Sequence, residues 1–394
     1  MQTFLMLPLE GASGMGINEI IMYIMVIFMA LGAIDKMLGN RFGLGAKFEE
    51  GIMAMGSLAM SMVGIIILAP ILAKLLSPVV VPFYRMLGAD PSMFATSLIA
   101  IDMGGFQLAQ QMALNTQAGL FAGVILGSMM GPTIVFSIPV ALGIIDKKDH
   151  RFLATGILSG MVTIPIGCFV GGLIMGMPLI IILKNLVPII LFAVLIALGM
   201  WFKPEAMIKG FSVFGQIIVI IGTFGLALGA VQSMVGVTLI PGIGSVRGGI
   251  QTVGSIALTL SGAFTLVYVI TKVFNKPLVR LGKALGMNET AAAGLVATLA
   301  NNIPMFEMMK DMDDRGKIIN VAFSVSAAFV FGDHLGFTAG VAKGMIFPMI
   351  VSKLVAGVTA IAVAMFMANR VLGNNDHKSQ NELNNKQKVN VDEH

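Results

Sequence analysis

Residues 51–73 read GIMAMGSLAMSMVGIIILAPILA, without one charged side chain. A helix needs roughly 20 such residues to cross about 30 Å of hydrocarbon. Comparable uncharged runs occupy residues 20–34, 118–145 and 211–234. Backbone groups find no water in lipid, so these runs must be helical. The stretch therefore predicts an all-α integral membrane protein that crosses the bilayer many times.

The composition excludes a soluble domain. Hydrophobic residues make up 57% of the 394 residues and charged residues only 11%, whereas soluble domains carry about a quarter charged residues. The net charge of +5 does not point to nucleic acid, because the Lys and Arg residues fall in short loops between spans. There they set the topology of the chain. We expect the lipid bilayer, and no nucleic acid, as the partner.

Hydropathy predicts 10–11 transmembrane or re-entrant helices between two terminal segments. Residues 1–16 are expected to form an N-terminal extension, and the polar residues 371–394 a disordered tail. The predicted helical segments are 17–36, 51–73, 92–114, 118–145, 152–175, 178–201, 211–234, 251–274, 289–308, 318–342 and 345–369.

The chain carries an internal repeat. A shift of 198 residues brings Gly51 onto Gly249, and a shift of 201 residues brings Gly131 onto Gly332, with further matches between. Duplicated halves around a site at the midplane of the bilayer are the architecture of many secondary transporters. The expected domains are repeat one at 17–176, a connecting helix at 177–210, and repeat two at 211–370.

The orientation of the two repeats depends on segments 92–114 and 289–308. If both cross the bilayer, the repeats are parallel, and if both turn back, the repeats are inverted. Both segments become polar halfway along. Non-helical backbone at membrane depth is tolerated only where it is buried or lines a cavity, so this pattern favours broken helices at the midplane.

The first candidate site is the segment that contains Asp102, Gly104, Gly105 and Gln107. The two glycines break the helix beside a carboxylate, and carboxylate and carbonyl oxygens together suit a cation. A structural ion pair between Asp102 and a lysine such as Lys184 is the alternative.

The corresponding segment of the second repeat contains Asn301, Asn302 and Pro304. Two side-chain amides before a proline both donate and accept hydrogen bonds, which suits a hydroxyl-bearing or zwitterionic ligand. Capping of a helix end is the alternative.

A third site lies at Gly332, Asp333 and His334, within an otherwise apolar span. The aligned residues of repeat one include Gly131 and Pro132, so both halves are expected to break here. Asp333 and His334 suit a proton relay or a cationic substrate, or a buried pair that holds helices together.

Glu49 and Glu50 form a fourth site at the start of a span. Acids at a helix start complement the helix dipole. The alternative is an anionic vestibule that gathers cations.

The sequence offers no catalytic site, no metal site and no cofactor site. An intramembrane aspartyl protease would need Gly at position 330, where this chain has Val330. The phosphate-binding Gly-rich Lys-Ser/Thr motif and the His-Glu-x-x-His zinc motif are both missing from the chain. We therefore expect no enzyme. A coupling Na⁺ or H⁺ and a homo-oligomer both stay open.

Several segments resemble the ethanolamine transporter family of the bacterial ethanolamine-utilisation pathway, EutH. The likeness covers about residues 15–370 and includes 16–25, 48–56, 88–95, 102–105, 127–143, 299–304 and 331–335. The resemblance implies uptake of ethanolamine across the cell (cytoplasmic) membrane of a bacterium.

Acids lie in or near the predicted spans, and no arginine lies deep in one, which favours a cation or small zwitterion. Together with the resemblance, this gives a hypothesis for binding. Asp102 or Asp333 holds the ammonium, and Asn301, Asn302 or Gln107 holds the hydroxyl. The alternatives are an ion-coupled carrier of another small amine, amino acid or carboxylate, and an amine sensor or scaffold that transports nothing.

Overall fold

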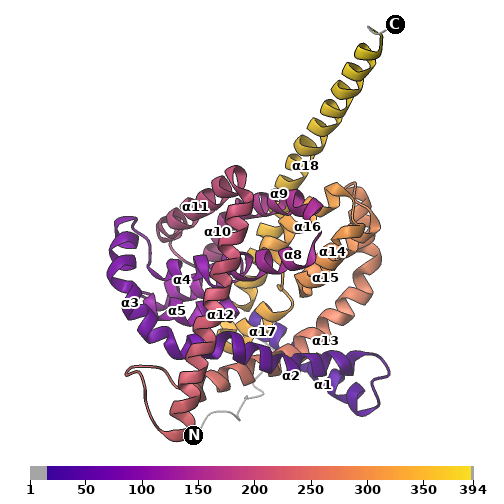
Figure 1. Cartoon of the computed structure of the whole chain (residues 1–394). Coiled ribbons are helices and arrows are strands. Elements are labelled where there is room, and N and C mark those ends of the chain that lie inside the picture. The colour runs from indigo at the N-terminus through magenta and orange to yellow at the C-terminus, as the bar shows by residue number, and fades with distance from the viewer. Residues whose placement is uncertain (1–15, 392–394) are drawn as a thin grey trace.

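All of the regular secondary structure between residues 16 and 391 is helical (Figure 1). The computed structural model describes these residues, and it describes their side chains except at 274–276, 278–279, 281, 283 and 372–391. The α-helices are α1 (Ile17–Met37), α2 (Leu44–Leu58), α3 (Gly64–Met86), α4 (Ser92–Leu98), α5 (Gly105–Met112), α6 (Thr116–Leu120), α7 (Met130–Pro132), α8 (Ile138–Ile144), α9 (His150–Met161), α10 (Ile164–Ile174), α11 (Leu179–Phe202), α12 (Pro204–Val235), α13 (Val246–Ala284), α14 (Glu289–Ala300), α15 (Asn302–Met308), α16 (Asp314–Ala327), α17 (Asp333–Val341) and α18 (Ile346–Val391).

Shorter turns of other helical types join or extend these helices. The π-helical turns are η1 (Ala59–Val63), η3 (Phe121–Leu126) and η4 (Thr133–Ser137), and the 3₁₀ turns are η2 (Ile101–Met103), η5 (Lys147–Asp149), η6 (Met309–Asp311) and η7 (Lys343–Met345). Turns of both types are frequent where a helix ends or is interrupted.

Eight segments of the described chain are long and apolar enough to cross a membrane. Their outward surfaces are apolar, as at Leu195 on α11 and Ile220 on α12, whose exposed fractions are 56% and 66%. The prediction of an all-α, multi-pass membrane protein is therefore confirmed. The eight segments are Ile17–Met37, Leu44–Met86, Thr116–Ile144, Lys147–Ile174, Leu179–Phe202, Pro204–Val235, Val246–Val273 and Lys343–Val371.

The segment at 92–114 is a helical hairpin made of α4 and α5. The carboxylate of Asp90 accepts a hydrogen bond from the backbone N–H of Ser92 at the start of α4 (2.9 Å). It also accepts one from the backbone N–H of Leu114, just past the end of α5 (3.1 Å). Because one carboxylate joins both ends, the segment turns back on itself.

Helices α14 and α15 form a second hairpin of the same kind. The backbone N–H of Asn288, before α14, donates to the carboxylate of Asp313 (2.8 Å). The side-chain amide of Asn288 donates to the carbonyl of Asp311, after α15 (2.9 Å). The two segments that the sequence left undecided thus both bring their ends together.

Each hairpin tip is bonded to a break in the helix that follows it. In the first half, the N–H of Ile101 donates to the carbonyl of Gly127 (2.8 Å). In the second half, the N–H of Phe331 donates to the carbonyl of Leu299 (2.9 Å). The helix breaks lie at 127–129 and 328–332, between η3 and α7 and between α16 and α17.

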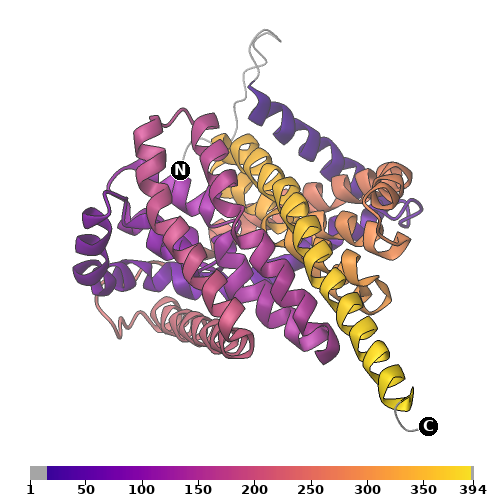
Figure 2. The ribbon, with the colours of Figure 1, turned by 90° about the horizontal axis from the view of Figure 1, so that it is seen from above.

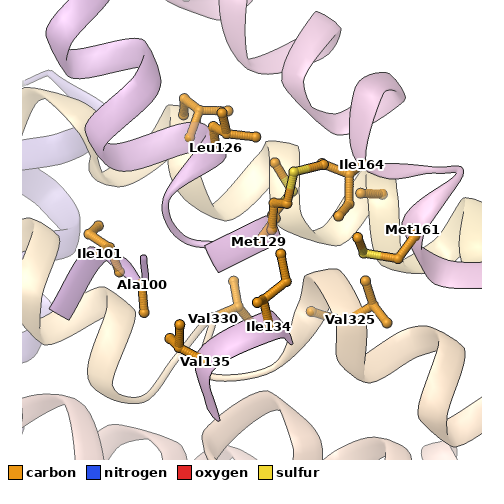
Figure 3. Packing of buried hydrophobic residues seen from close by; sticks show 14 of the residues in the cluster. Ala100, Ile101, Leu126, Met129, Ile134, Val135, Met161, Ile164, Val325 and Val330 are labelled. Carbon is orange, nitrogen blue, oxygen red and sulfur yellow. The ribbon is translucent and has the colours of Figure 1, made fainter. Parts of the chain in front are cut away.

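The breaks lie inside the protein, where irregular backbone is tolerated. Figure 3 shows Ala100 and Ile101 from the first hairpin tip packed in one cluster with Met129 and Val330 from the two helix breaks. All four are at most 1% exposed. The hydrophobic core therefore surrounds the interruptions rather than lying to one side of them.

Two close contacts join residues 51–63 to residues 249–261, and the shift that defines the repeat relates one contact to the other. A Cβ on Gly51 would collide with the backbone of Ser261, and a Cβ on Gly249 would lie 2.8 Å from Cγ1 of Val63. A shift of 198 residues converts the first pair into the second.

A second reciprocal contact joins the first helix of each half to the long helix of the other. A Cβ on Gly64 of α3 would collide with the carbonyl of Gly222 on α12. A Cβ on Gly262 of α13 would likewise collide with the carbonyl of Met25 on α1. These helices therefore approach backbone to backbone, as small residues allow in membranes.

Helix α18 runs between the two halves and then projects beyond them (Figures 1 and 2). It continues as a helix to Val391, over residues where a disordered tail was expected from residue 371. Of the expected N-terminal extension, residues 1–15 lie outside the described chain.

Candidate functional site

The first hairpin tip presents Asp102 at an opening in the helix. Ile99 has extended backbone, η2 follows, and Gly104 has a φ of 90°. This left-handed conformation favours glycine. A Cβ on Gly105 would collide with the carbonyls of Ile99 and Ala100. The two glycines thus let α5 start close against the end of α4, directly after η2, which contains Asp102.

The tip of the second hairpin carries two amides with different roles. Asn301 has extended backbone, and its side chain accepts from the N–H of Ile303 (2.9 Å), so it caps α15. Asn302 is fully buried and donates to the hydroxyl of Ser137 in the first half (2.7 Å). Pro304 lies in the first turn of α15, so the break is formed at Asn301 and not at the proline.

The third site brings a lysine to the two breaks. His334, in the first turn of α17, is 1% exposed, and its Nδ1 lies 3.1 Å from Nζ of Lys353. The ammonium of Lys353 also donates to the carbonyl of Ser128, in the helix break of the first half. The ammonium form of Lys353 has no acceptor, so with that form Nδ1 of His334 accepts and the ring is neutral.

The charges of the first and third sites converge. The carboxylates of Asp102 and Asp333 lie close enough to interact electrostatically. Asp102 interacts in the same way with Lys353. Lys184, considered as the partner of Asp102, instead passes its side chain beside Gly88. The structure therefore brings together two acids and one base that lie far apart in the sequence.

Aromatic rings from both halves pack on one another and on His334. Phe106 on α5 packs edge-to-face on Phe337 of α17, with ring centroids 5.7 Å apart. Phe329 packs on Phe136 in the same way and on the ring of His334 at 5.1 Å. Phe329 has a φ of 63°, which is uncommon outside glycine. Strained backbone of this kind persists where the surrounding structure holds it, often at functional sites.

Two amide oxygens near the breaks have no hydrogen-bond partner within the described residues. They are Oε1 of Gln107 on α5 and Oδ1 of Asn302 on α15. Buried polar atoms are nearly always paired, so these two are available to a donor that enters the site. Gln107 and Asn302 were both predicted as binding residues.

A cavity of about 240 Å³ leads from Glu50 to the second hairpin tip. Glu50 forms an ion pair with Lys47 (2.5 Å) and interacts electrostatically with Asp333. Glu49 is paired with Lys36 instead, so of the two predicted vestibule acids only Glu50 lines this cavity. The lining residues are Lys47, Glu50, Phe264, Val267, Tyr268, Thr271, Ala300 and Asn301.

The remaining predicted break residues lie beside the interruptions. Gly131 and Pro132 belong to the short α7, just after the break at 127–129, and Gly332 immediately precedes α17. A Cβ on Gly131 would collide with the carbonyl of Ile99, and a Cβ on Gly332 with the carbonyl of Ala300. A shift of 201 residues relates these two contacts. The glycines allow each hairpin tip to sit against its helix break.

Sequence reasoning missed Lys353 and Ser137. Lys353 is the one charged residue between positions 344 and 369. Since a charge in a membrane span is costly, the argument that singled out Asp102 and Asp333 applies equally to this lysine. Ser137 gave no such signal, because a small neutral side chain is common in membrane helices.

A buried ion pair joins the halves outside these breaks. Nζ of Lys317, on α16, lies 2.8 Å from the carboxylate of Asp149 in η5, and both residues are nearly inaccessible. The ammonium also lies 5.3 Å from the ring centre of Phe152. This pair was not predicted from the sequence.

Comparison with known proteins identifies relatives along nearly the whole chain. Residues 17–367 match the family described as "Ethanolamine utilisation protein, EutH". A "Probable ethanolamine permease EutH" of Listeria monocytogenes serotype 1/2a (strain 10403S) is 71% identical over 366 residues, which cover 93% of this chain and 98% of that protein.

Two further relatives are more distant. A protein of the same name from Escherichia coli (strain K12) is 54% identical, over 90% of this chain and 96% of its own length. "Uncharacterized protein YxeR" of Bacillus subtilis (strain 168) is 53% identical, over 90% of this chain and 95% of its own length. No solved structure matches the chain.

Proposed function

Because the chain belongs to the EutH family of ethanolamine utilisation proteins, we propose that it takes up ethanolamine across the cytoplasmic membrane of a bacterium for catabolism. The relatives from Listeria monocytogenes and Escherichia coli are each named "Probable ethanolamine permease EutH", and the chain is a multi-pass membrane protein of this permease family rather than an enzyme. The substrate, its binding residues and the arrangement of the repeats are the parts that we propose.

The two acids and one lysine that meet at the centre are the observation that carries this proposal. We propose that the substrate binds the form in which Asp102, Asp333 and Lys353 are ionised and His334 is neutral, which has one net negative charge. Primary ammonium groups stay protonated at neutral pH, as the lysine head group does. One ethanolamine cation would make the site neutral. A carboxylate substrate would double the imbalance instead.

The neighbouring amides would hold the hydroxyl of ethanolamine. The free amide oxygens of Gln107 and Asn302 accept hydrogen bonds, and Asn301 lies at the end of the cavity. Glu50 and Tyr268 line that cavity, and each already holds a lysine ammonium, Lys47 beside Glu50 and Lys272 over the ring of Tyr268, so both are groups that bind cations. The proposed route therefore runs from Glu50 past Asn301 to Asp333.

We further propose that the two halves are inverted repeats with the breaks near the midplane. Five of the candidate spans precede α12, and the hairpins α4–α5 and α14–α15 turn back. An odd number of crossings brings the second half into the bilayer from the opposite side. The reciprocal contacts at Gly51 and Gly249 agree with a two-fold relation between the halves.

Glu49 and Arg247 correspond under the shift of 198 residues, and both are exposed. Single cysteines at these positions, Glu49→Cys and Arg247→Cys, should react with a membrane-impermeant thiol reagent from opposite sides of the membrane. Whole cells and inverted vesicles provide the two measurements. The unaltered protein is the control, because its one cysteine, Cys168, is fully buried. Labelling of both positions from the same side would establish parallel repeats.

Counterflow in proteoliposomes tests the proposed substrate. Vesicles loaded with unlabelled ethanolamine should transiently accumulate labelled ethanolamine, and protein-free vesicles should not. Excess zwitterionic amino acid such as alanine, or excess carboxylate, on the outside should compete poorly, because neither carries a net positive charge at neutral pH. Absence of counterflow by correctly folded protein would favour the sensor or scaffold function.

A further inference from the structure

Lys353 occupies an unusual position for a lysine. It lies in the membrane-spanning part of α18, is 1% exposed, and reaches the helix break of the first half and α17 of the second. Figure 2 shows α18 between helices of the two halves. Its ammonium is therefore held at the place where the two repeats meet.

Two groups contact this ammonium directly, the carbonyl of Ser128 and Nδ1 of His334, and the first is of the kind that coordinates a monovalent cation. Ser128 presents its carbonyl just past the end of η3, and Asp102 supplies a nearby negative charge. In transporters with broken helices, carbonyls at the ends of half-helices coordinate the coupling ion. In this chain the ammonium of Lys353 occupies the place of such an ion at the carbonyl of Ser128.

We propose that the ammonium of Lys353 permanently takes the place of a coupling cation, so that the protein carries its substrate without sodium. The inference rests on the proposed transport function. A tethered cation has no concentration gradient, so it balances charge at the site but cannot drive transport. The second carboxylate, Asp333, is then left for the ammonium of the substrate.

A purely structural role for Lys353 explains less. Burying an ammonium is costly, and replacing buried charges by apolar side chains of similar volume is often neutral or stabilising. A methionine would fill the same space between α18 and the two breaks. A charge is required only if the carbonyl of Ser128 and the carboxylate of Asp102 need a cation beside them.

Thermal unfolding of the purified protein tests cation replacement without any transport measurement. Lys353→Ala should unfold several degrees below the unaltered protein in N-methylglucamine buffer, and sodium or methylammonium should restore much of the loss. Lys353→Met fills the space and should not respond to either ion. Lys343→Ala, at an exposed lysine near the start of the same span, should unfold like the unaltered protein in every buffer.

Ethanolamine counterflow tests the consequence for transport. The unaltered protein should be equally active in sodium and in N-methylglucamine, whereas Lys353→Ala should lose about tenfold or more and regain activity with sodium or methylammonium. Sodium-driven uptake by the unaltered protein would overturn the proposal, as would full activity of Lys353→Ala without a small cation. If Lys353→Ala does not fold, the sodium test on the unaltered protein still decides.

The two experiments separate this inference from the function on which it rests. Absence of ethanolamine counterflow by the unaltered protein refutes the proposed substrate. A lack of thermal response of folded Lys353→Ala to either cation refutes the tethered cation.

Discussion

Asp102→Asn and Asp333→Asn, made separately, should each lower ethanolamine uptake by about tenfold or more. A hydrogen bond to a charged group contributes about 1.5–3 kcal/mol, and each 1.4 kcal/mol is a factor of ten in affinity. Asp333→Asn removes such a bond to the substrate, and Asp102→Asn removes the negative charge beside Lys353, so each variant upsets the charge balance of the site. Uptake of labelled ethanolamine should be measured at acidic pH, where unassisted diffusion of the neutral amine is smallest.

The control for these variants is Asp311→Asn, which removes an exposed acid at the base of the second hairpin while keeping the backbone carbonyl that bonds Asn288. Its uptake should match that of the unaltered protein at equal expression. Unchanged uptake in both Asp102→Asn and Asp333→Asn would contradict the assignment of the ammonium site.

Lys317→Met should have the largest effect on stability. The change leaves the carboxylate of Asp149 buried and without its ammonium partner, and breaking a buried ion pair costs about 3–5 kcal/mol. The pair also joins α16 of the second half to the first half. Loss of the monodisperse peak after heating, followed by size-exclusion chromatography in detergent, measures the effect.

Two further variants test the cause of that loss. Lys148→Met removes a lysine whose side chain is 70% exposed in its pair with Asp146, and exposed pairs contribute about 0–1 kcal/mol. It should unfold almost like the unaltered protein. Adding Asp149→Asn to Lys317→Met should recover much of the stability, because no unpaired charge then remains buried. An undiminished stability of Lys317→Met alone would contradict the role of the pair.

The sequence predicted the fold class because a long apolar segment in lipid must form its backbone hydrogen bonds within itself, as a helix does. Polar residues and glycines at 102–105, 301–304 and 332–334 predicted interruptions because they are visible in the local sequence, and that the interruptions lie at the midplane stays a prediction. The sequence could not predict whether segments 92–114 and 289–308 cross the bilayer or turn back. That outcome depends on bonds such as Asp90 to Leu114, between residues that no local pattern connects.

The sequence predicted the residues of the candidate site one by one, but not that they lie close together. Asp102 and Asp333 were each recognisable by the cost of a charge in lipid. Their approach to one another, and the choice of Lys353 over Lys184 as the partner of Asp102, follow from the packing of α5, α17 and α18. The roles of Glu49 and Glu50 also separated only through their different lysine partners.

The single net negative charge proposed for Asp102, Asp333 and Lys353 has an electrical consequence. With its proposed cationic substrate bound, the site is neutral and feels no membrane potential when it changes sides. The empty site carries a negative charge, and the inside-negative potential drives it back outward. One elementary charge is worth about 2.3 kcal/mol per 100 mV, which corresponds to a roughly 50-fold concentration ratio. On this hypothesis the membrane potential alone concentrates the substrate in the cell.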